Sequence, residues 1–145
     1  MHFTRDHIND LEKIKKINLI NSCSGYKSAN LIGSISKQGI TNVAVFSSIT
    51  HLGSNPPTLG FIIRPTTVPR DTYKNIVESG IFTINHIYED ILADAHHTSA
   101  KYEEEVSEFD ITKLEAEYHN DCIVPFVKGS PVQMEMKFVE EYHIK

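Results

Sequence analysis

Residues 42–75 read NVAVFSSITHLGSNPPTLGFIIRPTTVPRDTYKN, a stretch with two predicted strands and the start of a predicted helix. Residues 42–48 predict a strand whose side chains alternate between two faces, and residues 58–64 predict another. Tandem prolines fix the exit from the loop between them. A second hinge, residues 64–70, leads into a helix that begins at Asp71. The segment therefore delivers hydroxyls, two guanidiniums and a helix N-terminus close together in the sequence, which are groups that bind a phosphate.

The polar residues of this segment form a candidate binding cluster: Ser47, Ser48, Thr50, Ser54, Arg64, Arg70, Asp71, Thr72 and Asn75. Hydroxyls at a strand end can donate to a ring carbonyl or a phosphate oxygen, and arginine can bind phosphate in a bidentate way. Free N–H groups at the start of the helix add partial positive charge. A second interpretation fits the spacing equally well: the same residues are turn formers, helix caps and surface arginines.

The residues before this stretch predict a helix, a loop and a strand. Thr4 is a suitable N-cap for a helix to about Ile17, with an apolar stripe that must pack on something. Either the helix covers one end of a barrel or it binds a partner. Residues 18–28 predict a loop, and residues 29–36 predict a strand that turns back at Gly39 to pair with residues 42–48. Gly33 in that strand indicates a bend or the close approach of another backbone.

The residues from Asp71 onward predict two helices and two further strands. Asp71 is the predicted N-cap of a helix to about Ser79, closed by Gly80 in a left-handed conformation. Residues 81–87 are typical of a strand, and residues 88–95 of a short helix. Residues 132–138 alternate strictly between apolar and polar side chains, which predicts a half-buried strand. The order of elements favours an α+β protein, mainly an antiparallel β-barrel with peripheral helices.

Composition limits the class of protein. A chain of 145 residues is long enough for a single domain, which we expect to span residues 1–145. The net charge of −5 disfavours nucleic acid as a partner. No apolar run approaches the ~20 residues that span a bilayer. The N-terminus lacks the plan of a signal peptide, so we expect a cytoplasmic protein with two reduced cysteines and no membrane partner.

Histidines are candidates for a pocket rather than for a metal site. His96 and His97, with two further histidines along the chain, match no zinc spacing, so we predict no metal. His51 is the better pocket residue, because the loop that carries it also carries Ser54. The sequence contains no G-x-S-x-G motif and no cysteine beside a plausible base, which disfavours nucleophilic catalysis.

At these residues the chain resembles a known family. The segments NLIGSISKQGITNVAVFSSI, HLGSNPPTLGFIIRP, VPRDTYKNI and GIFTINHI are similar to the flavin reductase-like family of FMN-binding split β-barrels, which includes flavoredoxin. The resemblance runs from about Leu19 to Phe138. Its specific signature is a strand that ends in Ser-Ser, a loop that ends in Pro-Pro, and an Arg-Asp-Thr-x-x-Asn helix start.

The resemblance implies a split barrel that forms a homodimer, with FMN at or near the subunit interface. It implies that Phe46, Ser47, Ser48, Ile49 and Thr50 face the isoalloxazine ring. Arg64, Arg70, Asp71, Thr72 and Asn75 would hold the ribityl phosphate. Residues 96–100, His96 and Ala100 included, would lie against the flavin from a neighbouring loop. Family members usually continue beyond a strand like residues 132–138 with another barrel strand, so either residues 1–145 are part of a longer barrel or the barrel closes differently.

The resemblance also implies a redox function. The expected reaction is hydride transfer from a nicotinamide, NADH or NADPH, to FMN, followed by electron delivery to free flavin or another acceptor. Hydroxyls and N–H groups near the pyrimidine edge of the ring, from Ser48 and Thr50, would stabilise the reduced anion. The alternative is a non-enzymatic electron carrier of the flavoredoxin type, reduced by a redox partner. A third possibility is a binding module with no cofactor, or with haem instead.

Overall fold

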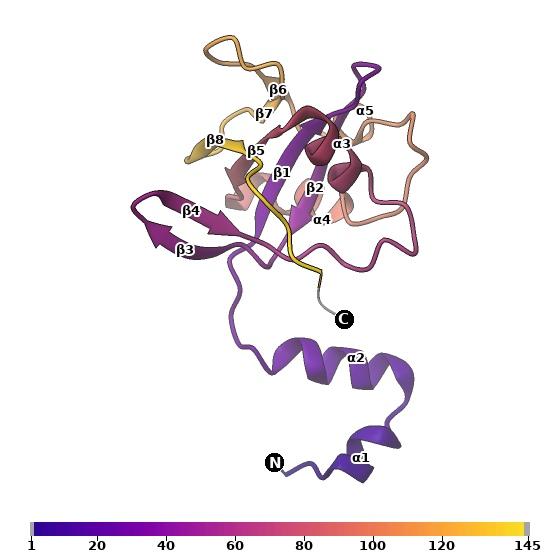
Figure 1. The fold of residues 1–145 in the computed structure, drawn as a ribbon. Helices are drawn as coiled ribbons and strands as arrows, with labels where there is room; N and C mark the ends of the chain where they lie inside the picture. Colours follow the sequence, from indigo (N-terminus) through magenta and orange to yellow (C-terminus); the bar gives the residue numbers. More distant parts are fainter. Residues whose placement is uncertain (1, 144–145) are drawn as a thin grey trace.

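A four-stranded antiparallel sheet forms the centre of the molecule (Figure 1). The computed structural model describes residues 2–143. The strands are β1 (Asn30–Ile35), β2 (Thr41–Phe46), β5 (Ile81–His86) and β8 (Gln133–Lys137), and their order in space is β2-β1-β5-β8. The β1–β2 and β5–β8 pairs are antiparallel, as is the β1–β5 pair between them.

Two small sheets complete the strand content. One is the hairpin of β3 (Thr50–Ser54) and β4 (Pro57–Gly60), and the other pairs β6 (Ala116–Glu117) with β7 (Phe126–Val127). Within residues 2–143 the central sheet does not close on itself, because β2 and β8 each have only one neighbour. The architecture confirms the predicted fold class, an α+β protein built on an antiparallel split barrel.

One face of the central sheet packs against α3 (Asp71–Ser79). Ile76 of α3 joins Ile32, Phe82 and Ile84 in a buried cluster. Phe61, from the chain after β4, contacts this cluster edge-on, because its ring centroid lies 5.7 Å from that of Phe82. The helix and the end of the hairpin therefore cover the same face.

The opposite face packs against the short helices η1 (Glu89–Ile91), α4 (Leu92–His97) and α5 (Glu108–Ile111). Its buried cluster contains Leu31, Val43, Ala95, Leu114 and Val127. The close backbone approach predicted at Gly33 is confirmed there, since a Cβ on that residue would lie 2.3 Å from the carbonyl oxygen of Pro125. Both faces of the sheet are covered, which explains why residues 42–48 are apolar on both sides.

Local turn chemistry is confirmed at two glycines. Gly39 has a φ of 85° in the β1–β2 turn, and Gly80 has a φ of 75° at the end of α3. Both values lie in the left-handed region that favours glycine. The region between β2 and α3 was predicted less well. The expected loop contains β3, and the strand expected over residues 58–64 ends at Gly60.

The N-terminal segment differs most from the prediction. The helix expected from Thr4 to Ile17 is two helices, α1 (Arg5–Asn9) and α2 (Lys13–Ser22), and α2 occupies the first part of the predicted loop. Thr4 does cap α1, accepting a hydrogen bond from the N–H of His7. The prediction that this helix covers an end of the barrel is wrong, because neither helix contributes a buried residue. Figure 1 shows both standing apart from the sheet.

Candidate functional site

Strand β2 connects the two halves of the predicted site. Its C-terminal end leads into residues 46–50, which were predicted to face a flavin ring. There Ser48 Oγ accepts a hydrogen bond from the N–H of Ile62 at 2.9 Å and lies 3.2 Å from the Ile62 carbonyl oxygen, to which it donates. Ser47 and Thr50 are exposed. This end of β2 therefore combines one hydroxyl that fixes the chain after β4 with two hydroxyls open to a ligand.

His51 and Ser54 lie on β3, within the hairpin rather than in a loop. The His51 Nε2 and Ser54 Oγ atoms are 3.0 Å apart, and both residues are exposed. The structure thus brings these two predicted residues together. The hairpin projects from the body next to the end of β2 (Figure 1).

The N-terminal end of β2 carries a buried polar cluster. Asn42 donates to Ser34 Oγ at 3.1 Å and to Thr72 Oγ1 at 3.0 Å. Asn75 donates to the same Ser34 oxygen at 3.2 Å. All four residues are buried, so the side chains of Thr72 and Asn75 point into the protein and hold α3 against β1 and β2. Sequence reasoning missed Ser34 and Asn42, which looked like ordinary members of alternating strands.

The first turn of α3 lies beside this cluster. The N-cap is Arg70, not Asp71 as predicted, and its side chain makes no capping hydrogen bond. The first N–H groups of the helix therefore remain available to a ligand. Arg64 and Arg70 are exposed, and among residues 2–143 neither forms an ion pair with an acidic side chain. Asp71, half-buried, is the first helical residue and occupies the end of the helix that favours an anionic side chain.

The two halves of the predicted site lie at opposite ends of one strand. The rise of an antiparallel strand is ~3.4 Å per residue, so Asn42 and Phe46 are separated by ~14 Å. A ligand that reaches both ends must be extended. At the C-terminal end of β2 it must carry a group that bonds to hydroxyls, and at the N-terminal end it must carry an anion.

The segment from α4 to α5 lies along the open edge of β2. Thr98 Oγ1 accepts from the N–H of Val45 at 2.9 Å, and Glu108 Oε2 accepts from the N–H of Val43 at 3.0 Å. These side chains satisfy N–H groups that an edge strand would otherwise expose. His96 and Ala100 flank Thr98 and are exposed. The predicted third wall of the site is therefore held against β2 by hydrogen bonds over a long sequence separation.

The electrostatics of this edge centre on Glu108. Burial raises the pKa of its carboxyl, the hydrogen bond from Val43 opposes the rise, and the negative charge of Asp71 adds to it. Lys74 of α3 pairs with Glu104 in the same segment, and that hydrogen bond raises the pKa of the lysine. The helix and the edge segment are thus linked close to the first turn of α3.

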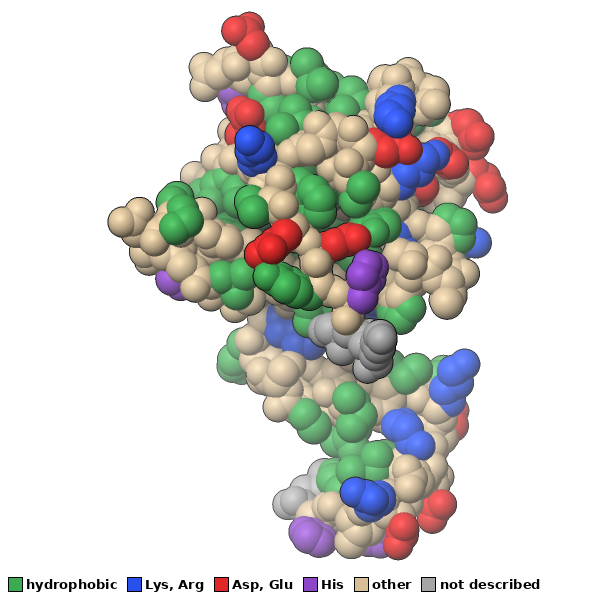
Figure 2. All heavy atoms as spheres, in the orientation of Figure 1, with side chains coloured by type: hydrophobic (Ala, Val, Ile, Leu, Met, Phe, Trp, Pro, Cys, Tyr) green, Lys and Arg blue, Asp and Glu red, His purple; other side chains and the backbone are tan. Residues whose placement is uncertain are grey.

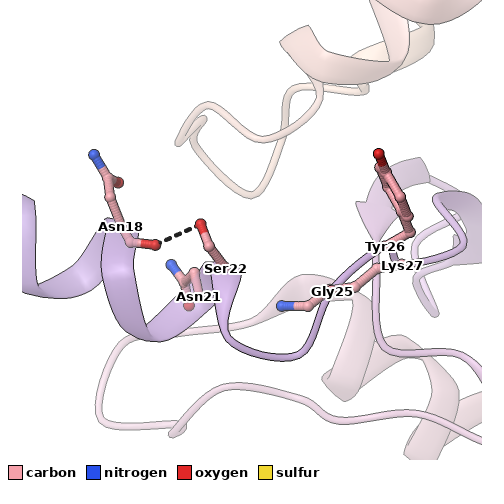
Figure 3. Close-up of a pocket in the computed structure, with 6 residues that line it drawn as sticks. All are labelled: Asn18, Asn21, Ser22, Gly25, Tyr26 and Lys27. Carbon is pink, nitrogen blue, oxygen red and sulfur yellow. Dashed lines mark hydrogen bonds between the residues drawn. The ribbon is translucent and has the colours of Figure 1, made fainter. Parts of the chain in front are cut away.

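A hollow of about 560 Å³ lies outside this region (Figure 3). Its walls come from one short segment at the C-terminal end of α2: Asn18, Asn21, Ser22, Gly25, Tyr26 and Lys27. The predicted cofactor residues all lie elsewhere, and Lys27 is the single charged side chain among these six. We therefore place the candidate site along β2, where several elements contribute donors at the two ends of the strand, and not at this hollow.

Residues 2–143 hold neither a candidate metal site nor a membrane-spanning helix. No group of three or more His, Cys, Asp or Glu side chains in that range could hold a metal ion. None of the helices described combines the length and the apolar character needed to cross a membrane.

Comparison with known proteins gives a consistent picture. Residues 26–145 match the model of the flavin reductase like domain. The crystal structure of a candidate flavin reductase with a split barrel domain, from Shewanella frigidimarina NCIMB 400, is 49% identical with a TM-score of 0.95. That similarity covers 99% of this chain and 71% of the other.

Two more distant proteins extend the comparison. The uncharacterized protein YwrF of Bacillus subtilis (strain 168) is 32% identical over 78% of this chain. The chain spans about half the length of the curated relatives it matches, 55% of YwrF. The FMN-binding domain of a flavin reductase-like enzyme from Shewanella baltica OS155 is 22% identical, with a TM-score of 0.64 over 79% of this chain and 59% of that one.

Proposed function

Because this chain belongs to the flavin reductase-like family, we propose that it binds FMN along β2, with the ring at the C-terminal end of the strand and the phosphate at the first turn of α3. The observation that carries the proposal is the presence of hydrogen-bond donors at both ends of β2. Exposed hydroxyls lie at its C-terminal end, and the first N–H groups of α3 lie beside its N-terminal end. FMN is extended, with its ring and its phosphate at opposite ends of a ribityl chain. The donor set therefore fits this cofactor, and the Shewanella baltica relative is described as an FMN-binding domain.

The residues divide into contacts and supports. We assign the phosphate to Arg64, Arg70 and the first N–H groups of α3, because guanidinium and helix N-terminus both favour an anion. Asp71 can only accept hydrogen bonds when ionised, so we assign it to the ribityl hydroxyls. The side chains of Thr72 and Asn75 are engaged in the buried cluster, and their part is to position α3.

The ring end uses the chain after β2. We assign the isoalloxazine to Phe46, Ser47, Ser48, Ile49 and Thr50, with His51 and Ser54 beside it on the hairpin. Thr98 holds its segment at the edge of β2, so His96 and Ala100 would border the ring from the second side. Ser48 is bonded to Ile62, so it supports the wall at this end, while Thr50 is free to donate.

The bound flavin would supply hydride and electron transfer, and the protein would bind and orient it. We propose that the protein is an oxidoreductase of the NAD(P)H:flavin reductase type. The hydroxyl of Thr50 and nearby main-chain N–H groups would stabilise negative charge that develops on the ring. We further propose a homodimer, which the resemblance implies, and a cytoplasmic location.

Two measurements test this function in order. Titration of the purified protein with FMN should quench flavin fluorescence and saturate at one FMN per chain. The loaded protein should then lose its flavin absorbance when NADH or NADPH is added without oxygen. FMN binding without reduction by either nicotinamide would instead support the electron carrier, and no FMN binding would overturn the proposal.

A further inference from the structure

The N-terminal arm, residues 2–27, makes few contacts with the rest of the described chain. Neither α1 nor α2 has a buried residue. Within the described part of the chain, each hydrogen bond or ion pair that the arm forms ends inside the arm, such as that from Lys16 Nζ to the carbonyl oxygen of Asn9. The body, residues 28–143, is by contrast tied together by long-range bonds. The arm therefore has a surface that the described part of its own chain does not cover.

Part of that surface is a row of isoleucine side chains on α2. Ile14, Ile17 and Ile20 follow at a spacing of three residues and are 64%, 47% and 53% exposed. Such side chains share one side of a helix. Tyr26, at the elbow between α2 and β1, is fully exposed and stands out from the chain in Figure 3. A ten-residue helix is marginal by itself in water, so α2 needs a surface to pack on.

Charge identifies the kind of surface that fits. The arm has five Lys or Arg residues against three Asp or Glu residues, a net charge of +2. The rest of the chain, residues 28–145, has nine against sixteen, a net charge of −7. Figure 2 shows green apolar side chains along the arm, and red acidic side chains at several places on the body. The arm thus complements the body of its own protein in charge.

The position of the arm is shared with a crystal structure. The similarity to the Shewanella frigidimarina protein covers 99% of this chain with a TM-score of 0.95, so it includes the arm. A displaced arm of this length would lower that score well below the value found. Two chains that differ at about half of their positions thus place this segment similarly relative to the sheet.

We infer that the arm docks on the body of a second copy of this chain, with the isoleucine side of α2 at the centre of the contact. In a two-fold dimer each arm would cross to its partner, so the contact would form twice. The inference rests on the proposed homodimer and names the segment that forms it. The hollow beside Tyr26 would then lie at the crossing point of the two chains.

The first test compares two aspartate substitutions in the full chain. The double variant Ile14→Asp/Ile17→Asp places charges in the proposed contact, and neither side chain is buried in the monomer. The matched control is Ile123→Asp, because Ile123 is 62% exposed and lies in the sequence between β6 and β7. Figure 1 shows these two strands at the end of the body away from the arm. Sedimentation equilibrium should show the dimer dissociation constant rising at least ~100-fold in the double variant only.

The second test asks which copy the arm touches. Equal amounts of protein with natural nitrogen and with ¹⁵N are mixed, exchanged and treated with a carbodiimide that joins lysines to carboxylates. Cross-links from Lys13, Lys15 or Lys16 to body carboxylates should contain one peptide of each label in half of all cases. Cross-links with a single label only would show that the arm folds back on its own body, and would overturn the inference.

The remaining outcomes separate this inference from the proposed function. A double variant that stays dimeric overturns the role of the arm but leaves the homodimer standing. A wild-type protein that is monomeric at all concentrations overturns both. The FMN titration is read separately in each case, so failure of cofactor binding cannot be confused with failure of the arm contact.

Discussion

At the C-terminal end of β2, Ser47 and Thr50 expose their hydroxyls, whereas at the N-terminal end Asn42 is buried and bonded to Ser34 and Thr72. The first end keeps its donors free for a ligand. The second uses them within the protein and fixes the helix whose first turn lies beside it. One strand therefore separates two tasks, contact with a ligand and placement of a helix.

This difference makes opposite predictions for substitutions at the two ends. Changes at buried, bonded residues should alter the free energy of unfolding. Changes at exposed residues of the proposed site should alter FMN affinity and leave unfolding nearly untouched. If both kinds of substitution altered the free energy of unfolding, or both altered FMN affinity, the two ends of β2 would not differ in this way.

The largest effect is expected for Asn42→Ala. It removes two hydrogen bonds from a buried cluster and leaves a small cavity, which should lower the free energy of unfolding by about 2–4 kcal/mol. Urea denaturation followed by circular dichroism measures it. Ser47→Ala is the matched control at the other end of β2, with an expected change within about 0.5 kcal/mol. Equal losses in the two variants would contradict the division of tasks.

Arg70→Ala should weaken FMN binding by about 1.5–3 kcal/mol, a rise in dissociation constant of about 10- to 150-fold. The reason is the loss of a charge-assisted contact with the phosphate. Fluorescence titration measures the affinity, and urea denaturation should show no significant loss of stability. Lys113→Ala removes an exposed positive charge next to Leu114, which packs on the face of the sheet opposite α3, and should leave FMN affinity unchanged. Unchanged affinity in the Arg70 variant would remove this residue from the phosphate site.

The sequence predicted well where structure depends on local chemistry. α3 ends at Gly80 as expected, because a left-handed residue after a helix is a local requirement that glycine meets. It begins one residue from the predicted cap, a common shift at helix ends. The β1–β2 hairpin was predicted from Gly39 and the alternation of its strands.

The sequence predicted poorly where structure depends on distant partners. β3 contains Gly53 and precedes Asn55, which are turn signals, yet it pairs with β4 across an irregular register between His51 and Gly53. Thr98 and Glu108 hold the edge of β2 from 53 and 65 residues away. No local pattern marks either as a partner of that strand. The exposure of the isoleucines on α2 likewise depends on what surrounds them in space, which periodicity cannot reveal.

The open edge of β2, between its two ends, is held by Thr98. Thr98→Val keeps the shape of the side chain but removes the acceptor for the N–H of Val45 and the donor to the carbonyl oxygen of Ala95. The free energy of unfolding should fall by about 1–2 kcal/mol, and the amide of Val45 should exchange with solvent faster. Ser99→Ala, a change at the exposed neighbouring residue, should do neither. Unaltered exchange at Val45 in the valine variant would show that Thr98 does not hold the edge.

The smallest effect concerns the pH dependence of stability. Burial raises the pKa of Glu108 in the folded protein above its value in the unfolded chain. The stability that Glu108 contributes is therefore full at a pH below its pKa in the unfolded chain. It is lost as the pH rises through its pKa in the folded protein. Glu108→Gln should remove that dependence on pH. The difference in the free energy of unfolding between wild type and variant should therefore change between the two pKa values and stay constant at higher pH.

Urea denaturation at a series of pH values measures this difference, and Glu105→Gln provides the control because Glu105 is exposed in the same segment. The amide oxygen introduced by Glu108→Gln can still accept the N–H of Val43, so this variant should remain within ~1 kcal/mol of wild type at neutral pH. The opposite result would be a wild-type protein that loses stability as the pH falls through this window, while the Glu108→Gln variant does not. That result would mean that the ionised carboxylate is the form that the edge of β2 prefers.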